Sequence, residues 1–158
     1  MRSMRKRIIP AISVRAPLEV EHWIDLEGCA EIEVSSENAA HPIDAALLPG
    51  NGGGWRANEP GPQTVRILFD APRKVTRMRV VVTEDRQQRT QEFVLRWAPA
   101  ADGPWREIVR QQYNFVPLSS EVEEYAMELD NVGAIELQIT PSISGGEAVA
   151  GLAEWRIG

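Results

Sequence analysis

The stretch Thr64-Val65-Arg66-Ile67-Leu68-Phe69 decides the fold class of this chain, because the side chains along it alternate between two faces. Val65, Ile67 and Phe69 share one face of an extended strand, in which successive side chains point to opposite sides. Strands with one apolar face are typical of antiparallel sheets that cover a core on one side only. The same period of two returns at residues 76–82, 93–97, 125–129 and 135–139.

Turn-forming residues separate these segments. Asp70-Ala71-Pro72-Arg73, Ala101-Asp102-Gly103-Pro104 and Asp130-Asn131-Val132-Gly133 are each predicted to divide two strands. Further strands are predicted at residues 19–24, 30–34, 105–109 and 153–157, which gives about nine strands, together with one short helix at residues 42–48. This number and spacing of short strands predict an all-β sandwich or barrel.

The size and charge of the chain narrow the class of protein. It has 158 residues, with 17 basic and 23 acidic side chains and a net charge of −6. We expect a basic tail or extra strand over residues 1–16 and a single domain over residues 17–158. The acidic balance argues against nucleic acid as a partner, and no apolar run is long enough to cross a membrane. The lone Cys29 and the lack of an export signal predict a cytoplasmic location.

Charge is segregated along the sequence. Residues 2–15 hold five basic side chains and no acidic one, whereas residues 19–37 hold seven acids and no Lys or Arg. Residues 121–158 hold eight acids and one basic residue, Arg156, and the middle of the chain is rich in arginine. We interpret these stripes as the solvated faces of strands that pair with one another.

The residues needed for known catalytic and metal sites are scarce. The only histidines are His22 and His41, so a site with three histidines is impossible, and we expect no metal and no cofactor. The glycine-rich loop at residues 49–54 does not follow a strand and lacks the Lys-Ser/Thr of a phosphate-binding loop. These absences favour a binding protein that is not an enzyme. An enzyme of unfamiliar type, using carboxylates such as Glu84 and Asp85, is the alternative.

Six segments occur in the order found in a known family. These segments are Ser35-Ser36-Glu37-Asn38, Pro42-Ile43-Asp44-Ala45-Ala46-Leu47, Gly54-Trp55-Arg56-Ala57, the strand from Gln63 to Asp70, Phe93-Val94-Leu95-Arg96-Trp97 with Asp102-Gly103-Pro104-Trp105, and Leu152-Ala153-Glu154-Trp155-Arg156-Ile157. In this order the sequence resembles the discoidin domain, also called the coagulation-factor C-type domain, and the carbohydrate-binding modules that share its galactose-binding-like fold.

This resemblance implies a jelly-roll antiparallel β-sandwich whose ligands bind to loops at one end. Residues 51–58, 83–90 and 141–147 are expected at that end, and the Asp102-Gly103 turn at the opposite end. The sequence departs from the family at its structural calcium site. Glu154 matches one of its ligands, but Pro49-Gly50 stands where the family has acidic residues.

A sugar site needs an aromatic face and planar hydrogen-bonding groups. The candidates for such a site are Trp55, Arg56, Asn58, Arg86, Gln88, Arg89 and Tyr113. Two alternatives stay open: Trp55 closes the end of the core and binds no ligand, and Arg86 and Arg89 pair with Glu84 and Asp85. Trp23, Trp97 and Trp155 are expected in the core.

The sequence therefore predicts a non-catalytic module that binds carbohydrate. The rival hypothesis is an intracellular protein-interaction module of the same fold, with a protein ligand or self-association into a homo-oligomer.

Overall fold

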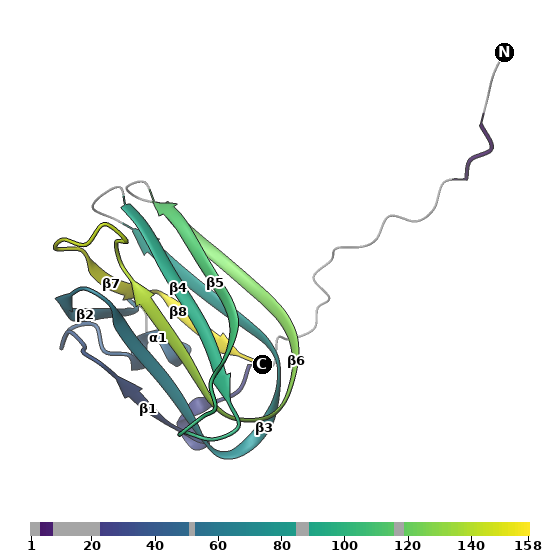
Figure 1. Ribbon diagram of the computed structural model, residues 1–158, viewed down its shortest axis with the longest axis horizontal. Coiled ribbons are helices and arrows are strands. Elements are labelled where there is room, and N and C mark those ends of the chain that lie inside the picture. The colour runs from purple at the N-terminus through teal and green to yellow at the C-terminus, as the bar shows by residue number, and fades with distance from the viewer. Residues whose placement is uncertain (1–3, 8–22, 51–52, 85–88, 116–118) are drawn as a thin grey trace.

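The computed structural model describes residues 4–7, 23–50, 53–84, 89–115 and 119–158 (Figure 1). No helix among these residues is long and apolar enough to cross a membrane. The elements in chain order are a 3-10 turn η1 (Leu26–Gly28), β1 (Ala30–Val34), α1 (Asp44–Leu47), β2 (Trp55–Pro60), β3 (Gln63–Glu84), β4 (Arg89–Ala98), β5 (Arg106–Phe115), β6 (Ser119–Thr140), β7 (Val149–Leu152) and β8 (Glu154–Ile157).

Two strands of 22 residues each, β3 and β6, take part in both layers of a β-sandwich (Figure 1). In the first layer, the start of β3 lies between β1 and the end of β6, and β4 and then β5 continue the sheet. In the second layer, the end of β3 lies between the start of β6 and β8. Strands β2 and β7 pair with each other. All of these pairs are antiparallel, which confirms the predicted antiparallel β-sandwich.

The prediction that residues 70–73 and 130–133 are turns between separate strands is wrong. Residues 70–73 lie inside β3, and the ladder with β6 only shifts its register between Leu68 and Arg77. Arg73 still pairs with Val132, so the two strands bend together and pass from one layer to the other. Asn131 takes the left-handed conformation at this bend, with φ 56°. The turn after Ala101 does separate β4 from β5, and α1 lies within the predicted helix.

The core lies between the layers and contains the side chains that the alternation assigned to it. Trp155, at 0% exposure, confirms one predicted core tryptophan, whereas Trp23 and Trp97 are only half-buried. Packing is tight at Gly133, where a Cβ atom would come within 2.1 Å of the carbonyl oxygen of Pro99. Both layers contribute, chiefly through Val65, Ile67, Met78, Val80, Phe93, Leu95, Ile135, Leu137, Ile139, Trp155 and Ile157.

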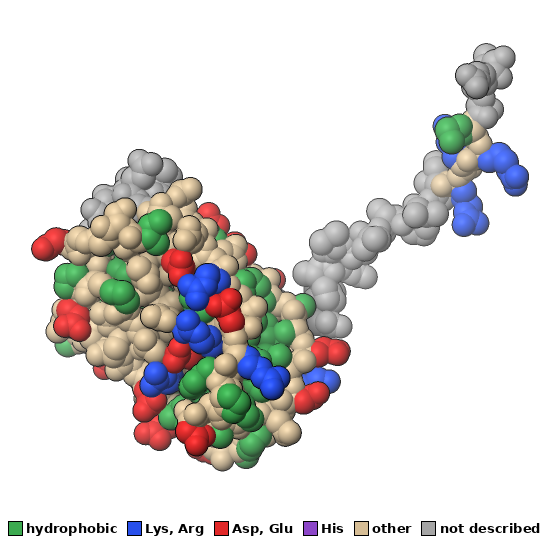
Figure 2. Space-filling view, in the orientation of Figure 1, with side chains coloured by type: hydrophobic (Ala, Val, Ile, Leu, Met, Phe, Trp, Pro, Cys, Tyr) green, Lys and Arg blue, Asp and Glu red, His purple; other side chains and the backbone are tan. Residues whose placement is uncertain are grey.

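On the outside of the first layer, charged side chains pair from strand to strand. Glu136 is 8% exposed and accepts hydrogen bonds from Arg66 Nε at 2.8 Å and Arg96 Nη1 at 2.9 Å. We call these three residues the Glu136 network. On β4 and β5, Glu92 pairs with Arg110 at 2.6 Å. Figure 2 shows basic and acidic side chains interleaved in a band across this view of the molecule, and the ion pairs confirm the predicted charge pairing for these strands.

Two buried glutamines on the inner face of the first layer differ in their hydrogen bonding. Gln63 is 3% exposed, and its Oε1 accepts hydrogen bonds from the hydroxyls of Ser35 at 2.6 Å and Ser36 at 2.8 Å. Gln91 is 0% exposed, yet neither atom of its amide forms a hydrogen bond with any residue that the structure describes. Its cross-strand partner is Tyr113. A buried amide without hydrogen bonds lowers the stability of the fold, whereas a hydrogen-bonded one does not. We therefore expect the Gln63 amide to stabilise the fold and the Gln91 amide to destabilise it.

Candidate functional site

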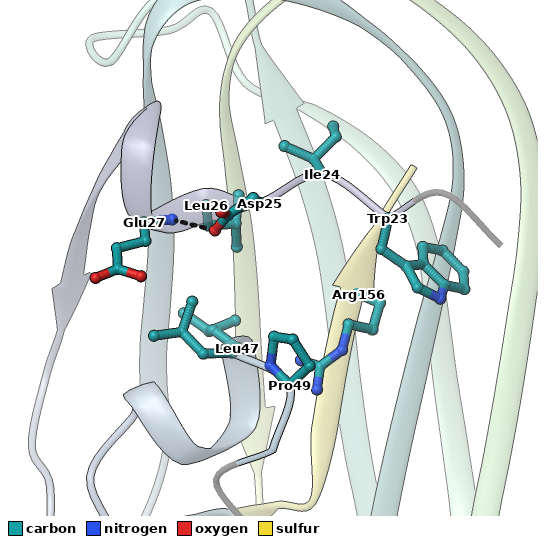
Figure 3. Close-up of a pocket in the computed structure, with 9 residues that line it drawn as sticks. Trp23, Ile24, Asp25, Leu26, Glu27, Leu47, Pro49 and Arg156 are labelled. Atoms are coloured by element: carbon teal, nitrogen blue, oxygen red, sulfur yellow. Dashed lines mark hydrogen bonds between the residues drawn. The ribbon is translucent and has the colours of Figure 1, made fainter. Parts of the chain in front are cut away.

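A pocket of about 530 Å³ opens on the outside of the second layer (Figure 3). One wall is the segment of residues 23–27, the other is residues 47–49 at the end of α1, and Arg156 of β8 lies between them. The first wall is fixed to β8 because the backbone N–H of Ile24 donates to the carbonyl of Ile157 at 2.7 Å. The second wall is fixed because Leu47, 4% exposed, packs into the core.

Arg156 is the principal donor of the pocket. Trp155 and Ile157 on either side of it are buried in the core, so the alternation of the strand directs Arg156 outward. Its Nη1 donates to the carbonyl of Ala46 at 2.8 Å, and its Nε lies 3.3 Å from Glu154 Oε1. These contacts join β8 to α1 and hold the guanidinium in one position.

Burial lowers the pKa of Arg156, while the Glu154 carboxylate opposes that shift and the nearby Arg79 adds to it. Arg79 lies directly opposite Arg156 on β3. An arginine remains a cation at neutral pH even with a lowered pKa, so Arg156 keeps its donors. Its side chain is 12% exposed, which means that water screens a ligand hydrogen bond only weakly.

Two exposed carboxylates on the first wall supply acceptors. Asp25 Oδ1 accepts a hydrogen bond from the backbone N–H of Glu27 at 3.1 Å and so caps η1 (Figure 3). A carboxylate has about four acceptor positions, so this cap leaves Asp25 able to accept further bonds. Glu27 is exposed on the same wall.

Apolar groups complete the pocket. Ile24 and Leu26 lie on the first wall and Leu47 and Pro49 on the second. Trp23 stands at the rim beside β8 (Figure 3), and the guanidinium of Arg77 lies 4.0 Å from the centre of its ring. A cation stacked in this way holds the indole in place.

The donors, acceptors and apolar walls together suit a neutral polyhydroxylated ligand. Adjacent hydroxyl groups can accept from a guanidinium and donate to a carboxylate, while C–H groups contact the apolar walls. The carboxylates of Asp25 and Glu27 disfavour an anion at the rim of this pocket.

The site predicted from the sequence is not assembled by the described residues. Trp55 is 1% exposed and its Nε1 donates to the carbonyl of Ser36 at 3.0 Å, so its ring closes the core and offers no face for stacking. Tyr113 is 8% exposed and stacks against Phe93, with ring centres 5.4 Å apart, rather than standing on a rim. Neither aromatic side chain can act as the predicted platform in this conformation.

The polar candidates are placed apart or lie outside the described residues. Arg56 and Asn58 are on β2, whose backbone bonds to the segment after β1, with Asn58 N–H donating to Ser36 Oγ at 3.0 Å. Tyr113 is on β5, at the opposite edge of the first layer from β1. The remaining candidates, Arg86, Gln88 and the side chain of Arg89, lie outside the described residues, so the predicted arginine loop stays a prediction.

The strand pairings place the ends of the predicted loop at residues 83–90, whereas much of the predicted loop at residues 51–58 is strand β2. Glu84 pairs with Ser119 and Arg89 with Phe115, so the ends of β3 and β5 and the starts of β4 and β6 lie at one end of the sandwich. The Asp102-Gly103 turn lies at the other end, between β4 and β5.

Sequence reasoning missed Arg156 as a functional residue. Its outward direction follows from the alternation around Trp155, but the contact with Ala46 joins residues 110 positions apart. No local pattern predicts that α1 and the segment of residues 23–27 enclose it. The described residues contain no group of three or more His, Cys, Asp or Glu side chains that could hold a metal ion.

Comparison with known proteins identifies the fold. No protein-family model matches the sequence, and no curated protein matches it either. Among solved structures, the family 32 carbohydrate-binding module of AlyQ, in complex with 4,5-unsaturated mannuronic acid, is similar with a TM-score of 0.61 and 12% identity over 81% of this chain and 93% of that one.

Two further structures are similar over the same share of this chain. The family 32 module of NanJ from C. perfringens, in complex with galactose, has a TM-score of 0.56 and 16% identity over 81% of this chain and 92% of that one. A Ruminococcus gnavus fucosidase in complex with fucose has a TM-score of 0.62 and 11% identity over 81% of this chain, which spans only 24% of the fucosidase. At these identities the similarity shows the fold, which is the discoidin, galactose-binding-like β-sandwich.

Proposed function

We propose that this protein is a non-catalytic carbohydrate-binding module that holds a neutral sugar unit in the Arg156 pocket. The observation that carries the proposal is the combination, in one pocket of about 530 Å³, of a fixed guanidinium, two carboxylates and apolar walls. Sugars are recognised by planar groups that bond pairs of hydroxyls and by apolar surfaces that contact C–H groups. The fucose and galactose ligands of similar structures support a neutral sugar as the ligand class.

The role of each residue follows from its position. Arg156 donates to ring or hydroxyl oxygens, Asp25 and Glu27 accept hydroxyl protons, and Leu47 and Pro49 contact the C–H face. Because Arg156 is already bonded to Ala46, little side-chain entropy is lost on binding. The site has no described nucleophile and base in contact, and the proposal includes no bond-breaking step.

Calorimetric titration against a panel of neutral mono- and disaccharides tests the proposal. Arg156→Lys keeps the charge but loses the planar donors, and Asp25→Asn keeps the η1 cap but loses the charge. We expect each to weaken binding about tenfold, the equivalent of one charge-assisted hydrogen bond. Glu31→Gln, exposed on β1 outside the pocket, is the matched control and should bind as the wild type does.

Thermal unfolding of each variant shows whether the domain stays folded after the substitution. Absence of binding to every neutral sugar by folded wild-type protein would overturn the proposed function. A double variant, Arg86→Ala with Arg89→Ala, tests the loop site expected from the sequence. If that variant alone loses binding, the sugar site is the loop end and the pocket assignment is wrong.

The cytoplasmic location stays a prediction, as do the exclusion of nucleic acid and membrane as partners and the homo-oligomer.

A further inference from the structure

The first half of β6, residues 119–130, is a sheet edge. It pairs with β3 on one side, from Glu84–Ser119 to Val75–Leu129, whereas β4 pairs with β6 only from residue 134 to residue 140. In the described part of the chain, no strand covers the outer side of residues 119–130, which we call the β6 edge. The outward N–H and C=O groups of such an edge are a template for another extended segment.

The β6 edge is strongly acidic. Its five acidic residues are Glu121, Glu123, Glu124, Glu128 and Asp130, with no Lys or Arg among them. Within the described residues these carboxylates form one ion pair, between Glu124 and Arg79 at 3.8 Å, and the Glu124 side chain is 59% exposed. Like charges on facing strands are destabilising, so the edge disfavours pairing with a second copy of itself and favours a basic segment.

The edge also presents apolar surface. Val122 is 49% exposed, one of three exposed large hydrophobic side chains among the described residues. Tyr125, Met127 and Leu129 alternate with exposed residues and are only half-buried. An added strand would cover these groups and bond the free backbone edge at once.

The chain itself contains one segment of complementary chemistry. Residues 2–15 hold Arg2, Arg5, Lys6, Arg7 and Arg15 and no acidic side chain. Between these charges stand Ile8, Ile9, Ile12 and Val14, residue types that favour strands.

The point where this segment joins the domain is close to the edge. Trp23 lies over Arg77, with 4.0 Å between the guanidinium carbon and the ring centre, and Arg77 pairs directly with Ala126 of the β6 edge. Trp23 therefore stacks on the side chain of a β3 residue that is the direct neighbour of the β6 edge. Residues 16–22 can span up to about 24 Å when extended, which is enough to bring residues 2–15 alongside it.

We propose that the basic segment of residues 2–15 adds to the β6 edge of its own domain as an extra strand, with its Lys and Arg side chains on the β6 carboxylates. Glu128 and Asp130 are exposed, so their carboxylates can be replaced with little effect on the rest of the fold. Binding of sugar in the Arg156 pocket is a separate property, because that pocket is lined by residues 23–27, 47–49 and 156.

Hydrogen-exchange mass spectrometry on the full chain tests this. Charge reversal of the segment, Arg5→Glu with Lys6→Glu and Arg7→Glu, should accelerate exchange at residues 119–130 by roughly tenfold, since these amides lose a strand partner. Adding Glu128→Lys and Asp130→Lys to that variant should restore the slow exchange by swapping the charges. Glu31→Lys on β1 is the control and should leave the edge unchanged.

Two results would overturn the inference. Equal exchange at residues 119–130 in the wild type and the segment variant would mean that no strand is added. A mass that rises with concentration in light scattering, together with loss of edge protection on dilution, would mean that the segment binds a second copy instead. Concentration-independent protection that the double charge swap restores supports the intrachain strand.

Discussion

Strands β3 and β6 pair with each other in both layers, and their charged side chains are paired differently in the two layers. In the first layer, Arg66 of β3 and Glu136 of β6 are direct neighbours, and Glu136 is shared with Arg96 at 2.9 Å. In the second layer the same two strands form the 3.8 Å pair of Arg79 and Glu124, beside four further acids of the β6 edge.

Burial explains the difference. Glu136 is 8% exposed, and a carboxylate removed from water must be paired or it destabilises the fold. The carboxylate of Glu124 is 59% exposed, so water solvates it and its pairing contributes little. The fold therefore depends on the buried carboxylate of Glu136 in the first layer far more than on the exposed carboxylate of Glu124 in the second.

The largest effect is expected from breaking the Glu136 network. Glu136→Ala leaves Arg66 and Arg96 without their shared partner and should lower the free energy of unfolding by about 2–3 kcal/mol. Glu33→Gln is the matched control, because Glu33 contacts the same Arg66 at 3.6 Å but is 54% exposed, and it should cost less than about 0.5 kcal/mol. Urea unfolding measures both, and equal losses would contradict the role of burial.

The two buried glutamines extend the comparison from charges to amides. Gln63→Leu removes the partner of the Ser35 and Ser36 hydroxyls and should destabilise the fold by about 1–2 kcal/mol. Gln91→Leu removes an amide that has no hydrogen-bond partner among the described residues, so it should leave the free energy of unfolding unchanged or raise it. Thermal unfolding of the two variants side by side distinguishes them. A loss at Gln91 equal to that at Gln63 would show that the Gln91 amide is satisfied in solution.

A smaller effect is expected at the β6 edge. Glu128→Gln removes an exposed carboxylate for which no ion pair is described, and the free energy of unfolding should change by less than about 0.5 kcal/mol. Urea unfolding at low ionic strength is the sensitive measurement. A loss above 1 kcal/mol, on the order of a buried pair, would place Glu128 in the same class as Glu136.

The smallest effect concerns pH. The hydrogen bond from Gln112, and then that from Arg110, lowers the pKa of Glu92 below its ordinary value of 4.5. A carboxylate with a lowered folded-state pKa adds stability above its ordinary pKa, and this stability is lost as the pH falls through the lowered pKa. In Glu92→Gln the free energy of unfolding should therefore fall slightly less steeply as the pH drops below 4.5. Above pH 4.5 its dependence on pH should match that of the wild type. An acid unfolding curve parallel to that of the wild type would contradict the assignment.

Much of the fold follows from local patterns. Alternation at residues 64–69, 93–97 and 135–139 predicts strands and their buried faces, because a half-buried strand must repeat with a period of two. The error at residues 70–73 has a physical cause. Asp and Pro favour a turn locally, but pairing of Arg73 with Val132 keeps the strand continuous, so the chain bends where it was expected to reverse.

The site follows from the sequence far less well. Trp55 has the residue type expected of a sugar platform, and only the packing of β2 against the core shows that its ring is enclosed. The Arg156 pocket is formed by three segments that are distant in sequence. Its main contact, from Arg156 to Ala46, produces no periodic pattern in the sequence from which it could be predicted. Composition can indicate which side chains recognise sugars, but the tertiary fold decides which of them share a surface.

The sharing of β3 and β6 by both layers has a consequence for how the chain folds during synthesis. Glu84 pairs with Ser119 and Gln63 with Ile139, so the ladder cannot begin to form before the start of β6 has been made and is complete only at its end. Ile24 is joined to Ile157 by a backbone hydrogen bond, and that contact waits for the last strand. Contacts so distant in sequence make folding slow. On the ribosome, the apolar faces of β3 and β4 stay exposed until β6 emerges, and in this interval the nascent chain depends most on protection from aggregation.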